Sequence, residues 1–237
     1  MVTHGKKYQD AIKLLDQSVA YAPAEAIDLA KKMSAAKFDE TVEMHLKMGL
    51  DPKNATQQLR GVAVLPHGLG KTVRVLVFAQ GEAEKAAQVA GADVYGGDEL
   101  IKKIEAGFLD FDVAISTPDM MSKVGKLGKV LGRRGLMPNP KSGTVVPAED
   151  FKKVIEEARK GRVEFKLDRS GIVHIILGKA SFEGQMLLEN MTSVVDAIIR
   201  SKPTGAKGQY IKSAYLATTM GPGVRLDLRA VSAMGGV

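Results

Sequence analysis

The sequence contains no cysteine and no tryptophan, and only 5% of its 237 residues are aromatic. The lack of cysteine excludes disulfide bonds, thiolate metal sites and a cysteine nucleophile, and it is compatible with a reducing compartment. No apolar run reaches about 18 residues, so we expect no membrane-spanning helix. No apolar stretch follows the segment 1–7, so we expect no secretory signal. These absences favour a cytoplasmic protein without a membrane partner.

The chain does have a sizeable apolar fraction and an excess of positive charge. Apolar residues make up 45% of the sequence, enough for a core, and the length allows one or two domains. The net charge is +7, and residues 160–237 hold 11 basic and 6 acidic residues. Two runs, 119–141 and 200–212, are strongly basic. Such runs suit an anionic partner such as nucleic acid, and an ordinary solvated surface explains either run equally well.

The N-terminal part predicts two helices followed by two strands. Apolar residues recur at helical spacing up to about residue 35, and Pro23 can open the second helix. From 41 to 48 apolar and polar residues alternate, which predicts a strand with one polar face. A short second strand is expected over 62–65. The apolar positions of the helices are Ile12, Leu15 and Val19, then Ile27, Ala30 and Met33.

The middle part alternates strands with helices, which indicates βαβ units around a parallel sheet. Strands are expected over 73–78, 92–95 and 113–116. Helices are expected over 82–90 and 98–106, with Asp98 as an N-cap. A long loop rich in Gly and Pro then leads to a charged helix over 148–159.

The C-terminal part returns to period-two alternation. Strands over 162–168 and 172–177 are expected to pair as a hairpin around the turn 168–171. A helix is expected over 183–200, with its apolar stripe at Leu187, Met191, Val194, Val195 and Ile198. A last hairpin is expected to run over 213–219, turn at 220–223 and return through Leu228.

These patterns predict a discontinuous two-domain protein that combines α+β and α/β classes. The N-terminal part has at most two strands, too few for a stable sheet alone, and the C-terminal part has hairpins of the same half-buried type, so we expect both to share one antiparallel sheet. Residues 1–67 and 160–237 would form this terminal split α+β domain. Residues 68–159 would form an inserted Rossmann-like domain with a parallel sheet. The crossings, His67–Gly70 and Lys160–Gly161, contain glycine and would allow a hinge.

Residue patterns give little support for an enzyme. The segment Gly68–Thr72 resembles a phosphate loop, but Leu65 stands where the first glycine is required and a strand follows. The four histidines, His4, His45, His67 and His174, are scattered without metal-ligand spacing. Asp110 and Asp112 lie in a surface-like loop, and Ser116, Ser181 and Ser193 lack a nucleophile context. We expect no cofactor and no metal, while a small Rossmann-type nucleotide-dependent enzyme stays as the alternative.

Nucleic-acid binding has better support. Lys37 and Phe38 place a cation and a ring at the entry of the first strand, where they can reach a phosphate and stack on a base or ribose. Phe38 can equally be a core residue. The strand faces add hydrogen-bonding groups, and the turn 218–223 contains two glycines and a proline that allow a close backbone approach. The polar side chains on the strand faces are Thr41, Glu43, Lys166 and Ser213.

Several long motifs then resemble one family over essentially the whole chain. They are residues 36–43, 65–71, 91–93, 132–141, 178–182 and 218–222. On these motifs the sequence resembles the bacterial large-subunit ribosomal protein L-one family, the protein of the mobile side stalk. The resemblance implies the same split architecture, and it implies RNA contacts made mainly by the terminal domain. By motif, the implied contacts are Lys37, Phe38, Thr41, Glu43, Ser213, Thr219, Met220 and Gly221; Lys166 joins them from the strand face.

The resemblance also implies a function without catalysis. Members bind a structured 23S rRNA element beside the exit site for tRNA, and stalk movement is linked to release of deacylated tRNA. Bacterial members bind a mimic of that RNA on their own operon mRNA and repress translation. We therefore expect a ribosome-associated cytoplasmic protein, monomeric when free, with 23S rRNA, exit-site tRNA and its own mRNA as partners. No role is assigned to the tail 230–237.

Overall fold

The computed structural model describes residues 5–235, which form two compact units. The terminal unit joins the chain up to Gly70 with the chain from Gly161 onward, and the inserted unit is Lys71–Lys160. The boundaries expected from the sequence lie after residues 67 and 159, next to these crossings. An antiparallel sheet and a separate parallel sheet confirm the predicted α+β and α/β class.

The terminal unit contains two antiparallel sheets. Its strands are β1 (Thr41–Met48), β2 (Arg60–Val64), β6 (Arg162–Lys166), β7 (Ile172–Lys179), β8 (Ile211–Thr218) and β9 (Val224–Arg225). The larger sheet has the order β7-β1-β8-β9, and the smaller sheet pairs β2 with β6. β1 comes from the N-terminal part and β7, β8 and β9 from the C-terminal part. Both ends of the chain therefore share one sheet, as predicted.

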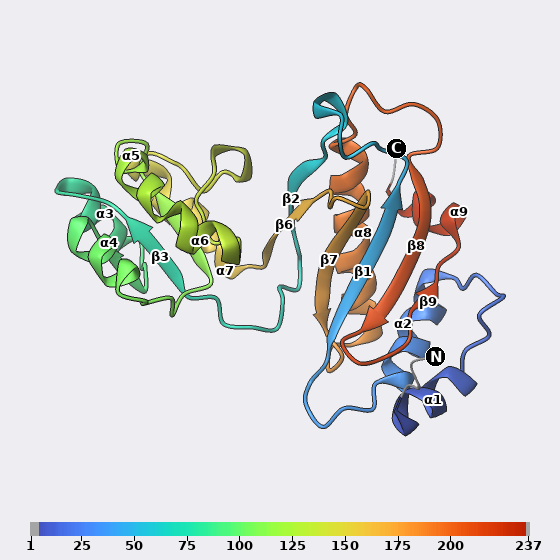
Figure 1. Ribbon diagram of the computed structural model, residues 1–237. Coiled ribbons are helices and arrows are strands. Elements are labelled where there is room, and N and C mark those ends of the chain that lie inside the picture. The colour runs from blue at the N-terminus through green and yellow to red at the C-terminus, as the bar shows by residue number, and fades with distance from the viewer. Residues whose placement is uncertain (1–4, 236–237) are drawn as a thin grey trace. The chain divides into compact units, whose positions relative to one another are not determined.

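Helices cover one face of the larger sheet. Those that pack against its strands are α2 (Pro23–Met33), α8 (Gly184–Arg200) and α9 (Leu228–Met234). The terminal unit also contains α1 (Lys6–Lys13) and the short 3-10 helix η1 (Ala55–Gln57). α2 and α8 pack side by side against the sheet (Figure 1). All five predicted apolar residues of α8 are fully buried, and each such side chain stabilises the fold by about 1.5–3 kcal/mol. The other face of β1 keeps its predicted polar character.

Strand register decides which side chains share that outer face. Along β1 the burial alternates, with Val42, Met44 and Leu46 fully buried. In the middle of the outer face, His45 pairs with His174 of β7 on one side and with Tyr215 of β8 on the other.

The inserted unit is built around a short parallel sheet. Its elements are β3 (Val75–Phe78), α3 (Glu82–Val89), β4 (Val94–Gly96), α4 (Asp98–Glu105), β5 (Val113–Ser116), α5 (Met121–Val124), η2 (Gly125–Leu127), α6 (Gly128–Arg134), η3 (Pro140–Ser142), η4 (Ala148–Asp150) and α7 (Phe151–Arg159). The strand order is β4-β3-β5. All four residues of β3 are buried, with Leu76 and Phe78 in one core and Val75 and Val77 in another. The central strand is thus covered on both faces, as in Rossmann-like folds.

Glycine is required at both crossings between the units. Gly70 has a φ of +69°, and a Cβ there would lie 2.8 Å from the Phe182 ring. Gly161 has a φ of +102°, and a Cβ there would lie 2.5 Å from the Cα of Gly68. Buried Asn190 of α8 accepts from the His67 N–H at 3.1 Å and donates to the Gly68 carbonyl at 3.1 Å. The first crossing is therefore anchored to α8, and the hinge stays a prediction.

The expected hairpin of residues 162–177 is wrong. β6 pairs along its length with β2, and it joins β7 only through the bridge between Leu167 and Val173. β7 instead pairs with β1 over its length. The turn itself forms, because the Asp168 carboxylate accepts the N–H groups of Ser170 and Ile172.

Several local expectations also differ from the structure. The loop after β5 contains the helices α5 and α6. Asp98 does not cap α4; the N-cap is Gly97, and the Asp98 carboxylate binds the Lys123 ammonium at 2.8 Å. Val19 lies outside α1 and is 43% exposed. At the end of the last hairpin, Leu228 begins α9 in place of a strand, and residues 236–237 of the tail lie outside the described residues.

Candidate nucleic-acid interface

The antiparallel pairing of β1 and β8 places the start of one strand beside the end of the other. Val42 pairs with Thr218, so the segment before β1 meets the turn after β8. The Thr219 N–H donates to the Thr41 carbonyl at 3.0 Å, and the Thr41 N–H donates to Thr219 Oγ1 at 2.9 Å. Two motifs that are far apart in the sequence therefore form one edge. We call it the contact edge, defined as Lys37, Phe38, Thr41, Thr219, Met220 and Gly221.

Glu40 holds the two halves of the contact edge together. Its side chain is fully buried, and its two carboxylate oxygens accept the N–H of Ala36 at 2.9 Å and the N–H of Met220 at 3.0 Å. Burial works against ionisation, but these backbone hydrogen bonds outweigh it and lower the pKa of the Glu40 carboxyl. The ionised carboxylate thus fixes the backbone of both segments.

Two large apolar side chains stand out of this fixed backbone. Phe38 is 56% exposed and Met220 is 62% exposed. A core role for Phe38, the alternative to stacking, does not fit this exposure. Groups that are held by rigid backbone but face solvent are suited to contact a partner, because little conformational freedom is lost on binding.

Gly221 is required by close packing inside its turn. A Cβ at this position would lie 2.4 Å from Thr218 Oγ1, and the Gly221 N–H donates to the Thr218 carbonyl at 3.1 Å. A side chain here would push the turn away from β8. The glycine therefore keeps Met220 in its place.

A third motif, residues 178–182, joins the same edge. The Lys179 ammonium donates to Thr41 Oγ1 at 3.0 Å. The Asp39 carboxylate accepts from the Ser181 N–H at 3.0 Å and from the Ser181 hydroxyl at 2.7 Å. Three separate motifs are thus bound into one hydrogen-bonded cluster.

The other predicted site residues lie apart from the contact edge. Glu43 follows it along the outer face of β1, where it pairs with Ala217 of β8. Ser213 lies on the same face opposite Lys47, further along the strand. Lys166 belongs to the smaller sheet, where it pairs with Arg60. The structure therefore brings six of the predicted residues together and spreads Glu43, Ser213 and Lys166 over neighbouring strands.

A histidine pair occupies the middle of this outer face. The Nδ1 atoms of His45 and His174 lie 2.9 Å apart, so one ring donates to the other. Burial and the neighbouring His174 lower the pKa of His45, against an opposing effect of Glu43. Burial beside His174 therefore favours the neutral form of the His45 ring.

The catalytic and metal alternatives find no support in the geometry. Asp110 and Asp112 both bind Arg74, and Asp112 also accepts from Lys71. The Ser116 hydroxyl donates to the Thr117 carbonyl. No group of three or more His, Asp or Glu that could hold a metal occurs within residues 5–235; His4 lies outside that range. Nor does that range contain a helix long and apolar enough to cross a membrane.

Comparison with known proteins identifies the family. The model of the Ribosomal protein L1p/L10e family matches residues 30–222. The chain belongs to this family. It is 96% identical, over all of both chains, to the large ribosomal subunit protein uL1 of Dehalococcoides mccartyi. It is 56% identical to the uL1 proteins of Chloroflexus aurantiacus and Chloroflexus aggregans, over 96% and 98% of both chains respectively.

Membership in the L1p/L10e family confirms the resemblance seen in the motifs. Proteins of this family are structural and non-enzymatic, so the prediction that the chain is not an enzyme is confirmed. The small Rossmann-type enzyme is thereby set aside.

Sequence reasoning gave no role to the buried carboxylate that organises the site. Glu40 stands in phase with the buried residues Val42 and Met44, so the alternation of β1 already places it on the inner face. A charged residue at an inward position must find hydrogen-bond partners. That signal could have marked Glu40 before the structure was known.

Proposed function

We propose that the chain is a structural constituent of the large ribosomal subunit that binds the side-stalk element of 23S rRNA through its contact edge. The observation that carries this proposal is the pair of exposed side chains, Phe38 and Met220, on a backbone fixed by buried Glu40. Family membership and the names of the curated relatives support the ribosomal setting. Association with ribosomes implies a cytoplasmic location.

The groups of the contact edge suit RNA in particular. Phe38 offers a ring on which a base or ribose can stack, and Lys37 beside it can reach a phosphate. The Thr41 hydroxyl accepts from Lys179, which leaves its own O–H to donate to a ribose or phosphate oxygen. Glu43 can accept from a 2′-hydroxyl, and Ser213 and Lys166 extend the contact along the sheet. Five of the six residues of the contact edge are uncharged, so they favour recognition of shape over plain attraction to phosphate.

Two finer activities extend the proposal. The chain would assist release of deacylated tRNA from the exit site, and it would repress its own operon by binding an mRNA mimic of the stalk element. Both rest on the family resemblance, since one RNA-binding site could serve the rRNA and the mRNA in turn. A free monomer fits both activities.

Titration with stalk RNA and with a scrambled RNA at several salt concentrations tests the proposal. We expect tighter binding to stalk RNA at every salt concentration, because hydrogen bonds and stacking persist when phosphate attraction is screened. Met220→Asp should weaken stalk binding about tenfold or more without unfolding the protein, since Met220 is exposed. Val89→Asp is the matched control, because Val89 is an exposed apolar residue of the inserted unit. Equal affinity for the two RNAs would refute specific recognition.

A further inference from the structure

A hollow beside the contact edge is not used by any contact described so far. It has a volume of about 590 Å³ and lies between α1 and the segment that leads into β1. One wall consists of residues 5–8 and Ala11, and the opposite wall of Met33 and residues 35–38. Met220 reaches it from the turn after β8. The hollow therefore shares Lys37, Phe38 and Met220 with the contact edge.

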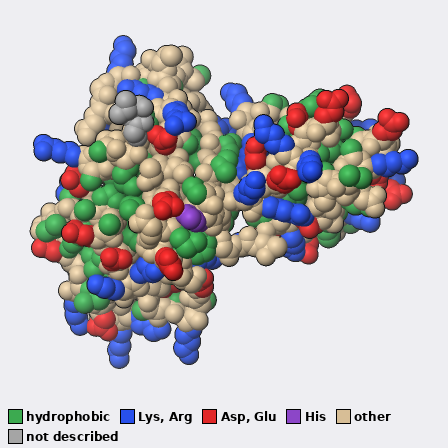
Figure 2. Space-filling view, turned by 180° about the vertical axis from the view of Figure 1, so that it is seen from behind, with side chains coloured by type: hydrophobic (Ala, Val, Ile, Leu, Met, Phe, Trp, Pro, Cys, Tyr) green, Lys and Arg blue, Asp and Glu red, His purple; other side chains and the backbone are tan. Residues whose placement is uncertain are grey.

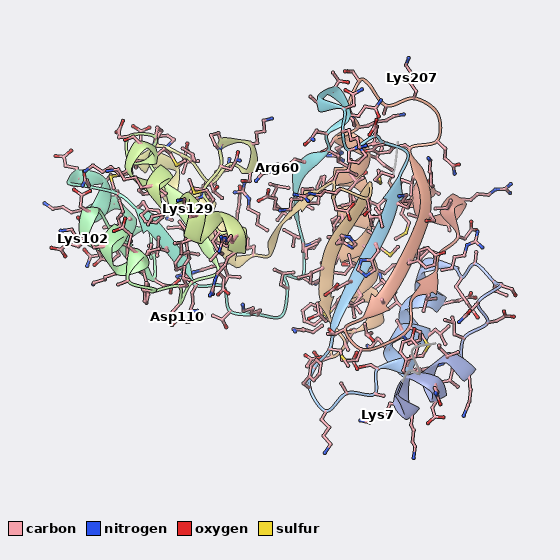
Figure 3. All side chains as sticks on the ribbon, viewed as in Figure 1. Lys7, Arg60, Lys102, Asp110, Lys129 and Lys207 are labelled. Atoms are coloured by element: carbon pink, nitrogen blue, oxygen red, sulfur yellow. The ribbon has the colours of Figure 1, made fainter. Side chains whose placement is uncertain are left out.

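The hollow combines apolar walls with a basic rim. Lys6, Lys7 and Lys37 line it, and none of the described lining residues is acidic. Figure 3 shows Lys7 at the end of the terminal unit that holds α1. Its ammonium donates to the Ala35 carbonyl at 2.9 Å and so ties the two walls together. Figure 2 shows several Lys and Arg side chains projecting from the end of the terminal unit that carries α1. A ligand that fits has a flat apolar body and a negative charge.

An unpaired nucleotide has this chemistry. Its base can stack on an aromatic ring and lie against apolar side chains, while its phosphate stays beside lysine at the rim. The Phe38 ring and the Met220 side chain form part of both surfaces, so an RNA strand on the contact edge continues into the hollow. An apolar peptide would gain nothing from the three lysines.

We propose that this hollow takes one unpaired nucleotide of the bound RNA, with its base between Phe38 and α1 and its phosphate beside Lys6 and Lys37. The inference rests on the proposed function, because the same RNA supplies the nucleotide. It gives α1, which no contact of the edge involves, a part in specificity.

Filling the hollow is the direct test. Ala35→Trp places a large side chain on one wall at an exposed position, so the fold should be kept. We expect the affinity for stalk RNA to fall about tenfold, since stacking of one base is worth that much or more. A second set of stalk RNAs carries a single abasic site at one unpaired position each. At one of these positions, removal of the base should weaken binding to the wild-type protein about tenfold. At that position the loss should be absent in Ala35→Trp, because the hollow is already closed to the base.

A charge variant gives a second readout at little risk to folding. Lys6→Ala should weaken stalk binding several-fold. It should also reduce the slope of log affinity against log salt concentration by about one, as expected for the loss of one phosphate contact. Lys13→Ala is the matched control on the same helix, because Lys13 pairs with Asp10 at 2.8 Å and does not line the hollow. Lys13→Ala should bind like wild type.

The outcomes separate this inference from the proposed function. Wild-type affinity in both Ala35→Trp and Lys6→Ala, with no sensitive abasic position, would refute nucleotide binding in the hollow. The proposed function would still stand in that case if the protein preferred stalk RNA over scrambled RNA. Loss of that preference in the wild-type protein would overturn both.

Discussion

The two units bury their sheets in different ways. In the inserted unit the central strand β3 is buried on both faces, with a separate core on each side. In the terminal unit the helices cover one face of the sheet, and the outer face of β1 stays polar and half-buried. A sheet with an open face can present side chains along its strands on rigid backbone, whereas a sheet covered on both faces can present them only at the strand ends. This difference supports the proposal that recognition belongs to the terminal unit.

The two units also differ in how their basic residues are paired with acidic residues. Residues 67–159 hold 14 basic and 13 acidic residues, and several of these pair with one another, such as Arg74 with Asp112, Lys123 with Asp98 and Arg159 with Asp93. The hollow of the terminal unit gathers three lysines, and its lining within residues 5–235 includes no acid. The position of a cation relative to its acidic neighbours thus says more about a partner than the net charge of a segment does.

Damage to the core of the inserted unit would be the harshest test of this difference. Phe151 is fully buried in a core made only of residues from the inserted unit. Phe151→Ala should destabilise that unit by about 3–5 kcal/mol. Hydrogen exchange should show the loss in β3, β5 and α7, while the affinity for stalk RNA stays at the wild-type level. A matching fall in affinity would show that recognition depends on both units.

Removal of the Glu40 carboxylate should affect stability and binding together. Glu40→Ala leaves the part-buried N–H groups of Ala36 and Met220 without their acceptor, and each such unpaired donor costs about 1 kcal/mol, the low end of the range for a fully buried group. Denaturant unfolding should report the loss of stability, and RNA titration should show weaker binding because both halves of the contact edge loosen. Glu82→Ala, at an exposed position of the inserted unit, is the control. Unchanged RNA affinity in a destabilised Glu40→Ala protein would show that the edge need not be preorganised.

Acid should reproduce part of that effect in the wild-type protein. Because hydrogen bonds lower the pKa of Glu40 in the folded state, its stabilising contribution is complete above the unfolded-state pKa of about 4.3. The contribution is lost as the pH falls through the lower folded-state pKa. The difference in unfolding free energy between wild type and Glu40→Gln should therefore shrink on acidification, as measured by urea unfolding at a series of pH values. A difference that does not change with pH would mean that the charge of Glu40 does not matter.

Replacement of a single lysine should have the smallest effect on RNA affinity. Lys37→Ala in the contact edge should weaken stalk binding several-fold. It should also reduce the slope of log affinity against log salt concentration by about one. Lys129→Ala in the basic run 119–141 should change neither, because that run belongs to the inserted unit (Figure 3). Titrations of both variants over a range of salt concentrations make the comparison. Equal losses would mean that the inserted unit contacts the RNA as well.

Local patterns predicted most of the terminal unit. The alternation of residues 41–48 gives β1 and its polar face, and the stripe of residues 187–198 gives α8. The pairing of β6 was wrong because alternation fixes the face of a strand but not its partner, which depends on contacts distant in sequence. The helices α5 and α6 were missed because they are short and interrupted by Gly125, Gly128 and Gly132, which lower helix propensity.

The candidate site was predictable in its parts but not in its assembly. Phe38 and Met220 stood in motifs, and their exposure only became clear in the structure. The link between the two segments depends on the register of β1 with β8 and on the hydrogen bonds of Glu40, neither of which is a local property. The hollow needs α1 as a second wall, and no motif includes α1.

Hydrogen exchange of the protein with and without stalk RNA would locate the interface most directly. Recognition by the contact edge predicts added protection at residues 36–41 and 219–221, and none at residues 121–141. Protection confined to residues 121–141, with no change at the contact edge, would contradict the assignment of recognition to the terminal unit.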